Sequence, residues 1–373
     1  MMDAGSCTTL EHVNVPPAQT WNYLKINEAT LRMPTPPAKG EVTSRLPRLF
    51  RAVEDGIGEA ATRWVEDFAG DARYIEVPRH ARRKDPILVE VDADEGQVAD
   101  TGVLVREGAE AIVALVSHAT GDGRTHSANL VRIICERGAR LTVSEVVALG
   151  DAHTHLEGLG IQVGEDATVT LRQYALGGRE VALGMAVDLV GDRSRLELET
   201  RYFANGKGLL DVNHIVRQRG RDTRADLHAH GLLDDAARKT LRETIDLVHG
   251  ARGSRGNESE TVLVVGEGVT NKTLPVILCD EDDVQGNHGA SIGSVGADQL
   301  AYLATRGLSE EAAFALFARA VFDDAIIHAA VSEARAAALA RATEVLGAKV
   351  ARDLSEALEL AQDSPAERDD ATC

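Results

Sequence analysis

The sequence has 373 residues, enough for two or three structural units around a sizeable buried core. Only 3% of its residues are aromatic, so the core must be aliphatic, which argues against aromatic-lined pockets for sugars or bases. The 40 basic and 59 acidic residues give a net charge of −19, and a field of that sign repels nucleic-acid backbones.

The N-terminus has no basic start and no apolar run of signal-peptide length, and no stretch reaches the roughly 20 apolar residues that span a bilayer. The cysteines are widely separated, so the sequence contains no zinc knuckle and no ferredoxin-type motif. We therefore expect a cytoplasmic protein with reduced thiols and no membrane partner.

Residues 1–74 are expected to form an N-terminal arm followed by a small helical region. Five prolines within the first 40 residues predict an irregular, extended arm, anchored at residues 20–24. Apolar residues between 44 and 68 recur at helical spacing, with Gly56 and Gly58 dividing the segment.

From residue 75 to residue 290 the apolar period is two, which predicts strands. Three segments share a Gly turn followed by alternating apolar residues. Leu141 and Val169 are 28 positions apart, and Val169 and Leu196 are 27 apart. A strand-bearing period of this length predicts a solenoid, because each coil buries its face against its neighbours. A β-sandwich with long loops would give similar strands without needing the period.

Residues 291–361 are expected to form a C-terminal helical domain, and the polar tail at 362–373 is expected to be disordered. Ser309 is a suitable N-cap, with two glutamates in the first turn that follows it. A second, alanine-rich helical stretch is predicted from about residue 324 to residue 360. It carries a narrow apolar stripe, formed by Leu346, Val350, Leu354 and Leu358.

Several linked motifs lie between residues 209 and 308. They include Asn-Lys-Thr-Leu-Pro at 271–275, Asp-Val-Gln-Gly-Asn-His-Gly-Ala-Ser-Ile-Gly at 283–293, and Arg-Gly-Leu at 306–308. In this order they resemble the core of the SufB/SufD family of iron–sulfur cluster assembly scaffold proteins. The SufB side of that family carries Glu-His-Glu where this chain has Asn-His-Gly, so the sequence is similar to the SufD side.

The resemblance implies a mainly β fold, a right-handed parallel β-helix with a C-terminal helical domain. It also implies that residues 236–248 form a strand, although their apolar residues show helical spacing. The implied function is that of a non-enzymatic scaffold or accessory subunit of the Suf complex. Its implied partners are a SufC-like ATPase and a SufB-like subunit, or a second copy of itself in a homodimer. An iron–sulfur cluster or iron would be bound transiently and shared with the partner.

His288 is the residue that the resemblance nominates as an iron or cluster ligand, in a tight polar loop between Gly286 and Gly289. The alternative is a histidine that hydrogen-bonds a strand-to-helix turn. Many SufD-side members have Cys where this chain has Gly286, so that thiol is absent. A SufB-type catalytic Cys would fall near residues 257–261, where this chain has none. The chain is therefore not expected to be a sole cluster scaffold.

Two further features near His288 have simpler interpretations. Cys279 ends an alternating apolar run, so we expect a buried and unreactive thiol. The acidic run at 280–283 is expected to be a solvated turn and not a cation site.

The pairs His153/His155 and His228/His230 each place two imidazoles on one face of a strand, a geometry that chelates metals. A metal-dependent enzyme using these pairs is therefore an alternative function. No third ligand follows at cupin spacing, so we expect both pairs on exposed solenoid faces. A β-helix carbohydrate-active enzyme is the other alternative, and the scarcity of aromatic residues argues against it.

Overall fold

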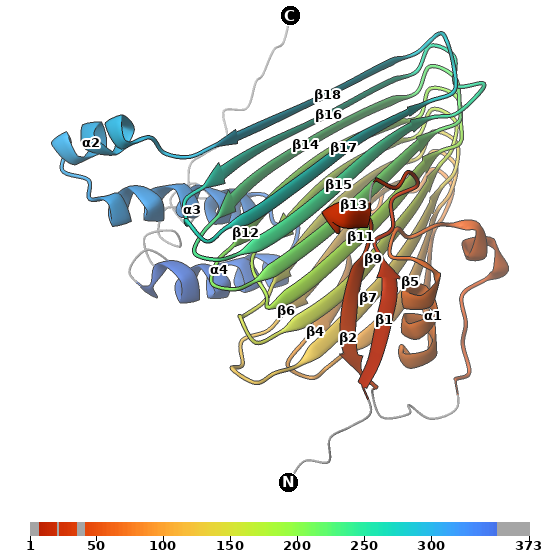
Figure 1. Cartoon of the computed structure of the whole chain (residues 1–373). Helices are drawn as coiled ribbons and strands as arrows, with labels where there is room; N and C mark the ends of the chain where they lie inside the picture. Colours follow the sequence, from red (N-terminus) through yellow and green to blue (C-terminus); the bar gives the residue numbers. More distant parts are fainter. Residues whose placement is uncertain (1–6, 21, 36–41, 349–373) are drawn as a thin grey trace, which may run out of the picture.

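The computed structural model describes residues 7–20, 22–35 and 42–348. Most of this part is a parallel β-solenoid made of two eight-stranded sheets, which the chain visits alternately (Figure 1). We call them the odd sheet and the even sheet. The odd sheet consists of β3 (Arg73–Val77), β5 (Val98–Val105), β7 (His126–Cys135), β9 (Thr154–Val163), β11 (Glu180–Leu189), β13 (Leu209–Gln218), β15 (Arg238–Leu247) and β17 (Thr270–Cys279). The even sheet consists of β4 (Ile87–Asp92), β6 (Glu110–His118), β8 (Arg140–Ala148), β10 (Thr168–Ala175), β12 (Arg195–Ala204), β14 (Arg224–Leu233), β16 (Arg255–Val264) and β18 (Gln285–Gly293).

The predicted period of the sequence is the length of one coil. Val169 of β10 pairs with Leu141 of β8 on one side and with Leu196 of β12 on the other. These are the residues whose spacing predicted the solenoid, so that prediction is confirmed. The strand expected within residues 236–248 is also present, as β15.

Along the strand direction, the interior of the solenoid has an apolar cluster toward each end of the strands and polar side chains between the two clusters. On β8, Val143 belongs to one buried apolar cluster and Val147 to another. Glu145 lies between them on the same inward face, because successive inward positions are two residues apart. Its neighbour on β10 is Gln173, whose own neighbour on β12 is Thr200. All three side chains are buried. A row of polar side chains therefore runs between two apolar clusters.

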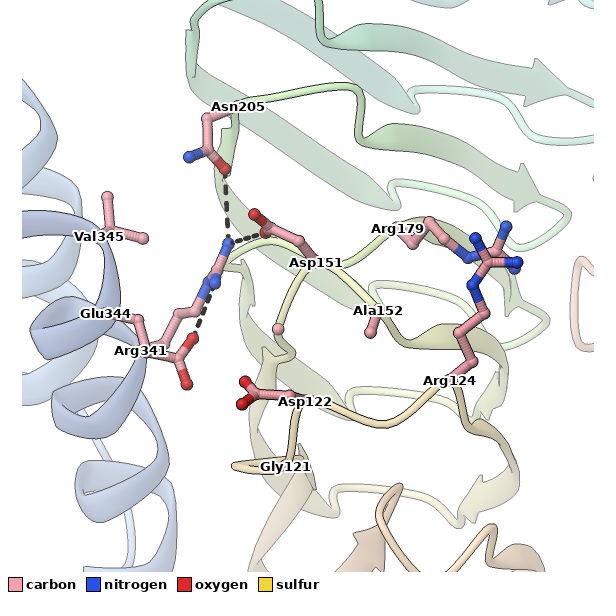
Figure 2. Close-up of a pocket in the computed structure, with 11 residues that line it drawn as sticks. Gly121, Asp122, Arg124, Asp151, Ala152, Arg179, Asn205, Arg341, Glu344 and Val345 are labelled. Atoms are coloured by element: carbon pink, nitrogen blue, oxygen red, sulfur yellow. Dashed lines mark hydrogen bonds and ion pairs between the residues drawn. The ribbon is translucent and has the colours of Figure 1, made fainter.

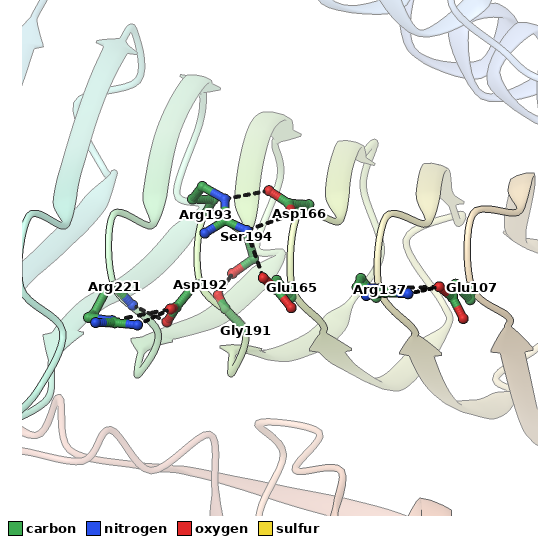
Figure 3. A network of polar contacts seen from close by, with 9 residues as sticks. All are labelled: Glu107, Arg137, Glu165, Asp166, Gly191, Asp192, Arg193, Ser194 and Arg221. Carbon is green, nitrogen blue, oxygen red and sulfur yellow. Dashed lines mark hydrogen bonds and ion pairs between the residues drawn. The ribbon is translucent and has the colours of Figure 1, made fainter.

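Exposed ion pairs connect the turns of successive coils (Figure 3). The Arg193 guanidinium donates to Asp166 at 2.7 Å, and that of Arg221 donates to Asp192 at 2.8 Å. Because water screens such exposed pairs, they contribute little to stability.

The N-terminal segment contains a hairpin that the prediction of an irregular arm missed. Strands β1 (Cys7–Val13) and β2 (Ala29–Pro34) are antiparallel, with a short 3-10 helix, η1 (Asn22–Leu24), between them. The hairpin packs on the outer face of the odd sheet (Figure 1), since its apolar residues form one buried cluster with residues of that face. That cluster includes Leu10, Leu31, Leu130 and Leu156.

The helical region expected at 44–68 is confined to the 3-10 helix η2 (Arg48–Ala52) and α1 (Glu59–Phe68). The glycines between them explain the interruption. Gly56 has φ of +81°, and a Cβ there would lie 2.5 Å from the backbone nitrogen of Met185. Glycine at this position therefore allows the connection to lie directly on the backbone of β11.

Three helices follow the solenoid, α2 (Ala297–Thr305), α3 (Glu310–Ile327) and α4 (Ser332–Leu346). Ser309 caps α3, accepting from the Ala312 amide at 3.1 Å, as predicted. The helical stretch expected from about 324 to 360 is interrupted in its first part, since α3 ends before residue 328 and α4 begins after it. Val350, Leu354, Leu358 and the tail at 362–373 lie outside the described residues.

Helices α3 and α4 cover the outer face of the even sheet, opposite the N-terminal hairpin (Figure 1). The rings of Phe322 on α3 and Phe203 on β12 lie 5.5 Å apart. None of the described helices is long and apolar enough to cross a membrane.

A buried ion pair ties the N-terminal segment to the solenoid. Arg242 on β15 donates to both carboxylate oxygens of Asp211 on β13, at 2.7 and 3.0 Å. The same guanidinium donates to the Ile26 carbonyl, and Asn14 donates to Asp211 at 2.8 Å. The Arg242 and Asp211 side chains are 1% and 7% exposed.

We predict that Arg242→Ala lowers the free energy of unfolding by about 3–5 kcal/mol, because it leaves the Asp211 charge buried without its partner. Urea denaturation of the wild-type protein and the Arg242→Ala variant measures the difference in their free energies of unfolding. Arg221→Ala is the matched control, since the same change removes an ion pair whose arginine is 66% exposed. Equal losses from the two substitutions would contradict the prediction.

Candidate functional site at the open end of the solenoid

The two sheets end at β17 and β18, and each of these strands pairs with a neighbour on one side only within the described residues. Figure 1 shows the last coil lying open at the edge of the solenoid. All nine residues of β18 are exposed, whereas the inward positions of the earlier coils are buried. The open end therefore presents a strand edge and the inward faces of the last coil.

His288 lies on this last strand. The prediction of a tight loop is wrong, because residues 285–293 form a regular strand paired in parallel with β16. His288 is opposite Glu258 in that pairing, and its Nδ1 is 3.8 Å from Glu258 Oε1. The imidazole therefore points toward the interior, but it stays 53% exposed because no further coil covers it.

The carboxyl group beside His288 is buried and protonated at neutral pH. Burial raises the pKa of Glu258 to about 9, and the negative charge of Glu243 adds to the effect. Glu258 therefore brings no negative charge next to the imidazole. Neutral imidazole is the form of histidine that binds metal ions.

The residues around His288 supply no thiol. Gly286 lies on the same face of β18 as His288. A Cβ at Gly286 would be 2.9 Å from Ile277 Cγ2, so this position of β18 packs against β17. Residues 257–261, where a SufB-type Cys would fall, form the middle of β16. Asn257 of that segment accepts from Asn287 Nδ2 at 2.8 Å.

Cys279 is exposed, so the expectation of a buried thiol is wrong. Its strand neighbour Leu247 is fully buried, which shows that the alternating pattern does point residue 279 inward. Position 279 belongs to the last strand of the odd sheet, however, and no described coil covers it. Its Sγ donates to the Glu281 carbonyl at 3.3 Å.

The acidic run at 280–283 is a largely exposed turn, as expected. Glu281 accepts from the Gly250 amide at 3.0 Å, and this bond lowers the pKa of its carboxyl group. Within the described residues, no three His, Cys, Asp or Glu side chains are grouped so that they could hold a metal ion.

The first histidine pair is buried, which corrects the expectation of an exposed face. His153 and His155 are both 0% exposed. His153 Nε2 lies 3.1 Å from Asp94 Oδ1, and His155 Nε2 lies 2.9 Å from Glu157 Oε2. Each imidazole thus has a carboxyl partner, which is buried for Glu157 and 30% exposed for Asp94.

The second pair lies on the outer face of β14, since its neighbours Leu227 and Ala229 point inward. His230 is exposed as expected. His228 is half-buried, and its Nδ1 is 2.7 Å from Ser259 Oγ.

A polar recess lies between α4 and the turns of the solenoid (Figure 2). Arg341 of α4 closes one side of it, donating to Asp151 at 2.7 Å, to Glu344 at 2.8 Å and to the Leu176 carbonyl at 3.0 Å. Because these acceptors already match its charge, Arg341 serves to hold α4 on the solenoid. The recess is also lined by Asp122, Arg124, Arg179 and Asn205.

A second, apolar recess lies beside α2 and α3. Tyr302 at its edge is 57% exposed. Leu303 of α2, Phe317 of α3 and Leu263 at the end of β16 complete the apolar lining. This recess is an uncovered apolar surface of the C-terminal helical part.

Comparison with known proteins agrees with the resemblance noted in the sequence. The family model described as SUF system FeS cluster assembly, SufBD core domain, matches residues 88–321. An iron–sulfur cluster assembly SufBD family protein of Mycobacterium leprae is 28% identical over 275 residues, covering 71% of this chain and 69% of that protein.

Proteins named SufD are among the relatives. The iron–sulfur cluster assembly protein SufD of Bacillus subtilis is 25% identical over 204 residues, which are 51% of this chain and 47% of that protein. SufD of Escherichia coli is 23% identical over 255 residues, which are 66% of this chain and 60% of that protein. The family model covers more than half of the chain, from the second solenoid strand into α3, and the chain belongs to the SufB/SufD family of iron–sulfur cluster assembly proteins.

Proposed function

We propose that this chain is a non-catalytic subunit of a Suf iron–sulfur cluster assembly complex, acting in the cytoplasm. In this proposal its open end pairs with a SufB-like subunit, and its helical part docks a SufC-like ATPase. Iron or a nascent cluster is the cargo at the junction. The observation that supports the proposal is the uncovered last coil, whose edge strand carries His288. The same junction would form in a homodimer if the partner is a second copy.

An exposed strand edge favours pairing with another strand. The unpaired backbone groups of β18 are a template for a further strand, and a partner that covers them removes an aggregation hazard. Ile292 on this strand is 59% exposed, so the edge also offers an apolar side chain to the partner.

We expect Ile292→Asp to weaken pairing with the SufB-like subunit at least about tenfold, or about 1.4 kcal/mol, because it places a charge in the interface. Size-exclusion chromatography with light scattering on the co-expressed subunits measures the pairing. Val190→Asp is the control, since Val190 is 36% exposed in the turn after β11, away from the open end. Pairing of the Ile292 variant at the wild-type level would place the interface elsewhere.

His288 is proposed to contribute one ligand to the cargo at this junction. Its imidazole is half exposed, and the adjacent Glu258 carboxyl group is uncharged at neutral pH. Imidazole is a competent ligand for ferrous iron. Because no thiol accompanies His288 on β18, the partner subunit would supply the remaining ligands.

His288→Ala should leave folding and complex assembly unchanged and lower the iron content of the complex about tenfold or more. Metal analysis of the anaerobically purified complex tests this. His230→Ala, on the outer face of the same sheet, is the matched control. If the His288 variant retains as much iron as the control, His288 is a structural residue of the last strand.

The apolar recess at α2 is the proposed docking site of the SufC-like ATPase. Helices α3 and α4 bury most of their apolar residues against the even sheet, whereas Tyr302 and the recess beside it are left open. An ATPase helix with an apolar face fits such a groove.

Tyr302→Asp should therefore abolish co-purification of the ATPase while the SufB-like subunit is still retained. A point substitution is the better test than truncation, because removal of α3 and α4 would expose the apolar outer face of the even sheet. Tyr23→Asp changes a tyrosine that is 71% exposed on the N-terminal segment and serves as control. Normal ATPase retention by the Tyr302 variant would exclude this recess as the docking site.

A further inference from the structure

Two glutamates face each other inside the solenoid, far from its open end. Glu145 lies on β8 of the even sheet, and Glu157 lies on β9 of the odd sheet. They are 1% and 2% exposed. Two ionised carboxylates at such a position would repel each other strongly, because little water screens them.

Hydrogen bonds account for one oxygen of each carboxyl group. Glu157 Oε2 accepts from Ser117 Oγ at 3.1 Å and lies 2.9 Å from His155 Nε2. Glu145 Oε1 accepts from Gln173 Nε2 at 2.9 Å. His155 Nδ1 lies 2.8 Å from Ser127 Oγ. A proton on His155 Nε2 satisfies this arrangement, because Nε2 then donates to Glu157 while Nδ1 accepts from the serine hydroxyl.

The other two carboxyl oxygens have no hydrogen-bond donor among the described residues. They are Glu145 Oε2 and Glu157 Oε1, and both are buried. Glu157 reaches across the interior to Ser117 of β6, the strand that pairs with β8, so its carboxyl group lies on the Glu145 side of the interior, and the interaction between the two groups raises the pKa of Glu145. A proton on one of these oxygens would satisfy both, since it would turn an acceptor into a donor.

We propose that Glu145 and Glu157 form a buried proton-binding site, in which the neutral carboxylic acid of Glu145 donates from Oε2 to the ionised carboxylate of Glu157. The hydrogen-bond pattern assigns the proton to Glu145, because Glu157 already receives two other donors and Glu145 receives one. Burial raises the pKa of Glu145 well above its usual value, and the Glu157 charge adds to this.

Within the described residues, no Lys or Arg side chain pairs with either carboxyl group. The polar groups that face the site from β6, β7 and β10 are uncharged: Ser117, Ser127, Gln173 and Asn129, the neighbour of Glu157 on β7. The titratable groups are His155 on β9 and, beyond Gln173, His214 on β13 with Glu243 on β15. His214 Nε2 is 2.9 Å from Gln173 Oε1, and its Nδ1 is 3.2 Å from Glu243 Oε1.

The proton links the two sheets of the solenoid. With the proton bound, one hydrogen bond joins β8 to β9 across the interior. Without it, two negative charges occupy the same buried site and push the sheets apart. The folded chain binds this proton more tightly than the unfolded chain does, so its stability falls as the pH rises from the unfolded toward the folded pKa of Glu145. This inference does not depend on the proposed role in cluster assembly.

Infrared spectroscopy of the full chain tests the site, because a buried carboxylic acid has a C=O stretch separate from that of carboxylates. We expect Glu145→Gln to remove one such band at neutral pH, while the band of Glu258 remains as an internal reference. The amide of the introduced glutamine replaces the donor, so the urea midpoint at neutral pH should be kept and its decline toward alkaline pH should become smaller. Glu145→Ala should lower the midpoint at neutral pH, because it removes the donor.

A second variant keeps the test decisive if Glu145→Gln does not fold. In Glu157→Gln the burial that raises the pKa of Glu145 is unchanged, so Glu145 stays protonated and donates to the new amide oxygen. The carboxylic-acid band should therefore remain in Glu157→Gln, whereas it disappears in Glu145→Gln. Loss of the band in Glu157→Gln, an unchanged band in folded Glu145→Gln, or equal neutral-pH midpoints for Glu145→Gln and Glu145→Ala would overturn the proposal.

Discussion

The parallel register between successive coils is the constraint on which the rest of the structure depends. Each strand pairs with the strand two elements earlier and two later, so an inward residue always lies between the same positions of its neighbours. Val169 between Leu141 and Leu196 is one such column. The column keeps apolar side chains together, and it also obliges any inward polar side chain to find its partner in an adjacent coil or across the interior.

This constraint explains why so much of the fold could be predicted from the sequence. A register that repeats in space must repeat in sequence, so the spacing of Leu141, Val169 and Leu196 gives the coil length directly. The same logic holds locally for Ser309, whose capping role depends on the next three residues only. The N-terminal hairpin could not be predicted in this way, because β1 and β2 are held by their contact with the outer face of the odd sheet.

The candidate site was less predictable because burial at the end of a solenoid depends on whether a further coil covers it. The period-two pattern correctly points Cys279 inward, beside Leu247, yet the thiol is exposed since β17 is the last strand of its sheet. The opposite error affects His153, which is buried and paired with Asp94, although nothing in its local sequence indicates a carboxyl group 59 residues away. The signal for the interior glutamates was available, since Glu145 interrupts an apolar alternation at an inward position.

The polar row also gives a physical reason for the open end to attract a partner. Within the row, inward polar side chains bond to a neighbouring coil or to the opposite sheet, as Gln173 does to Glu145 and to His214. The last coil has no further described coil beside it that could provide such hydrogen-bond partners. Glu258 and His288 are opposite each other, but the next coil that would complete their surroundings is not part of the described chain. A partner that continues the register would therefore cover the β18 edge and complete the polar surroundings of His288 in one step, so strand pairing and ligand supply are consequences of the same geometry.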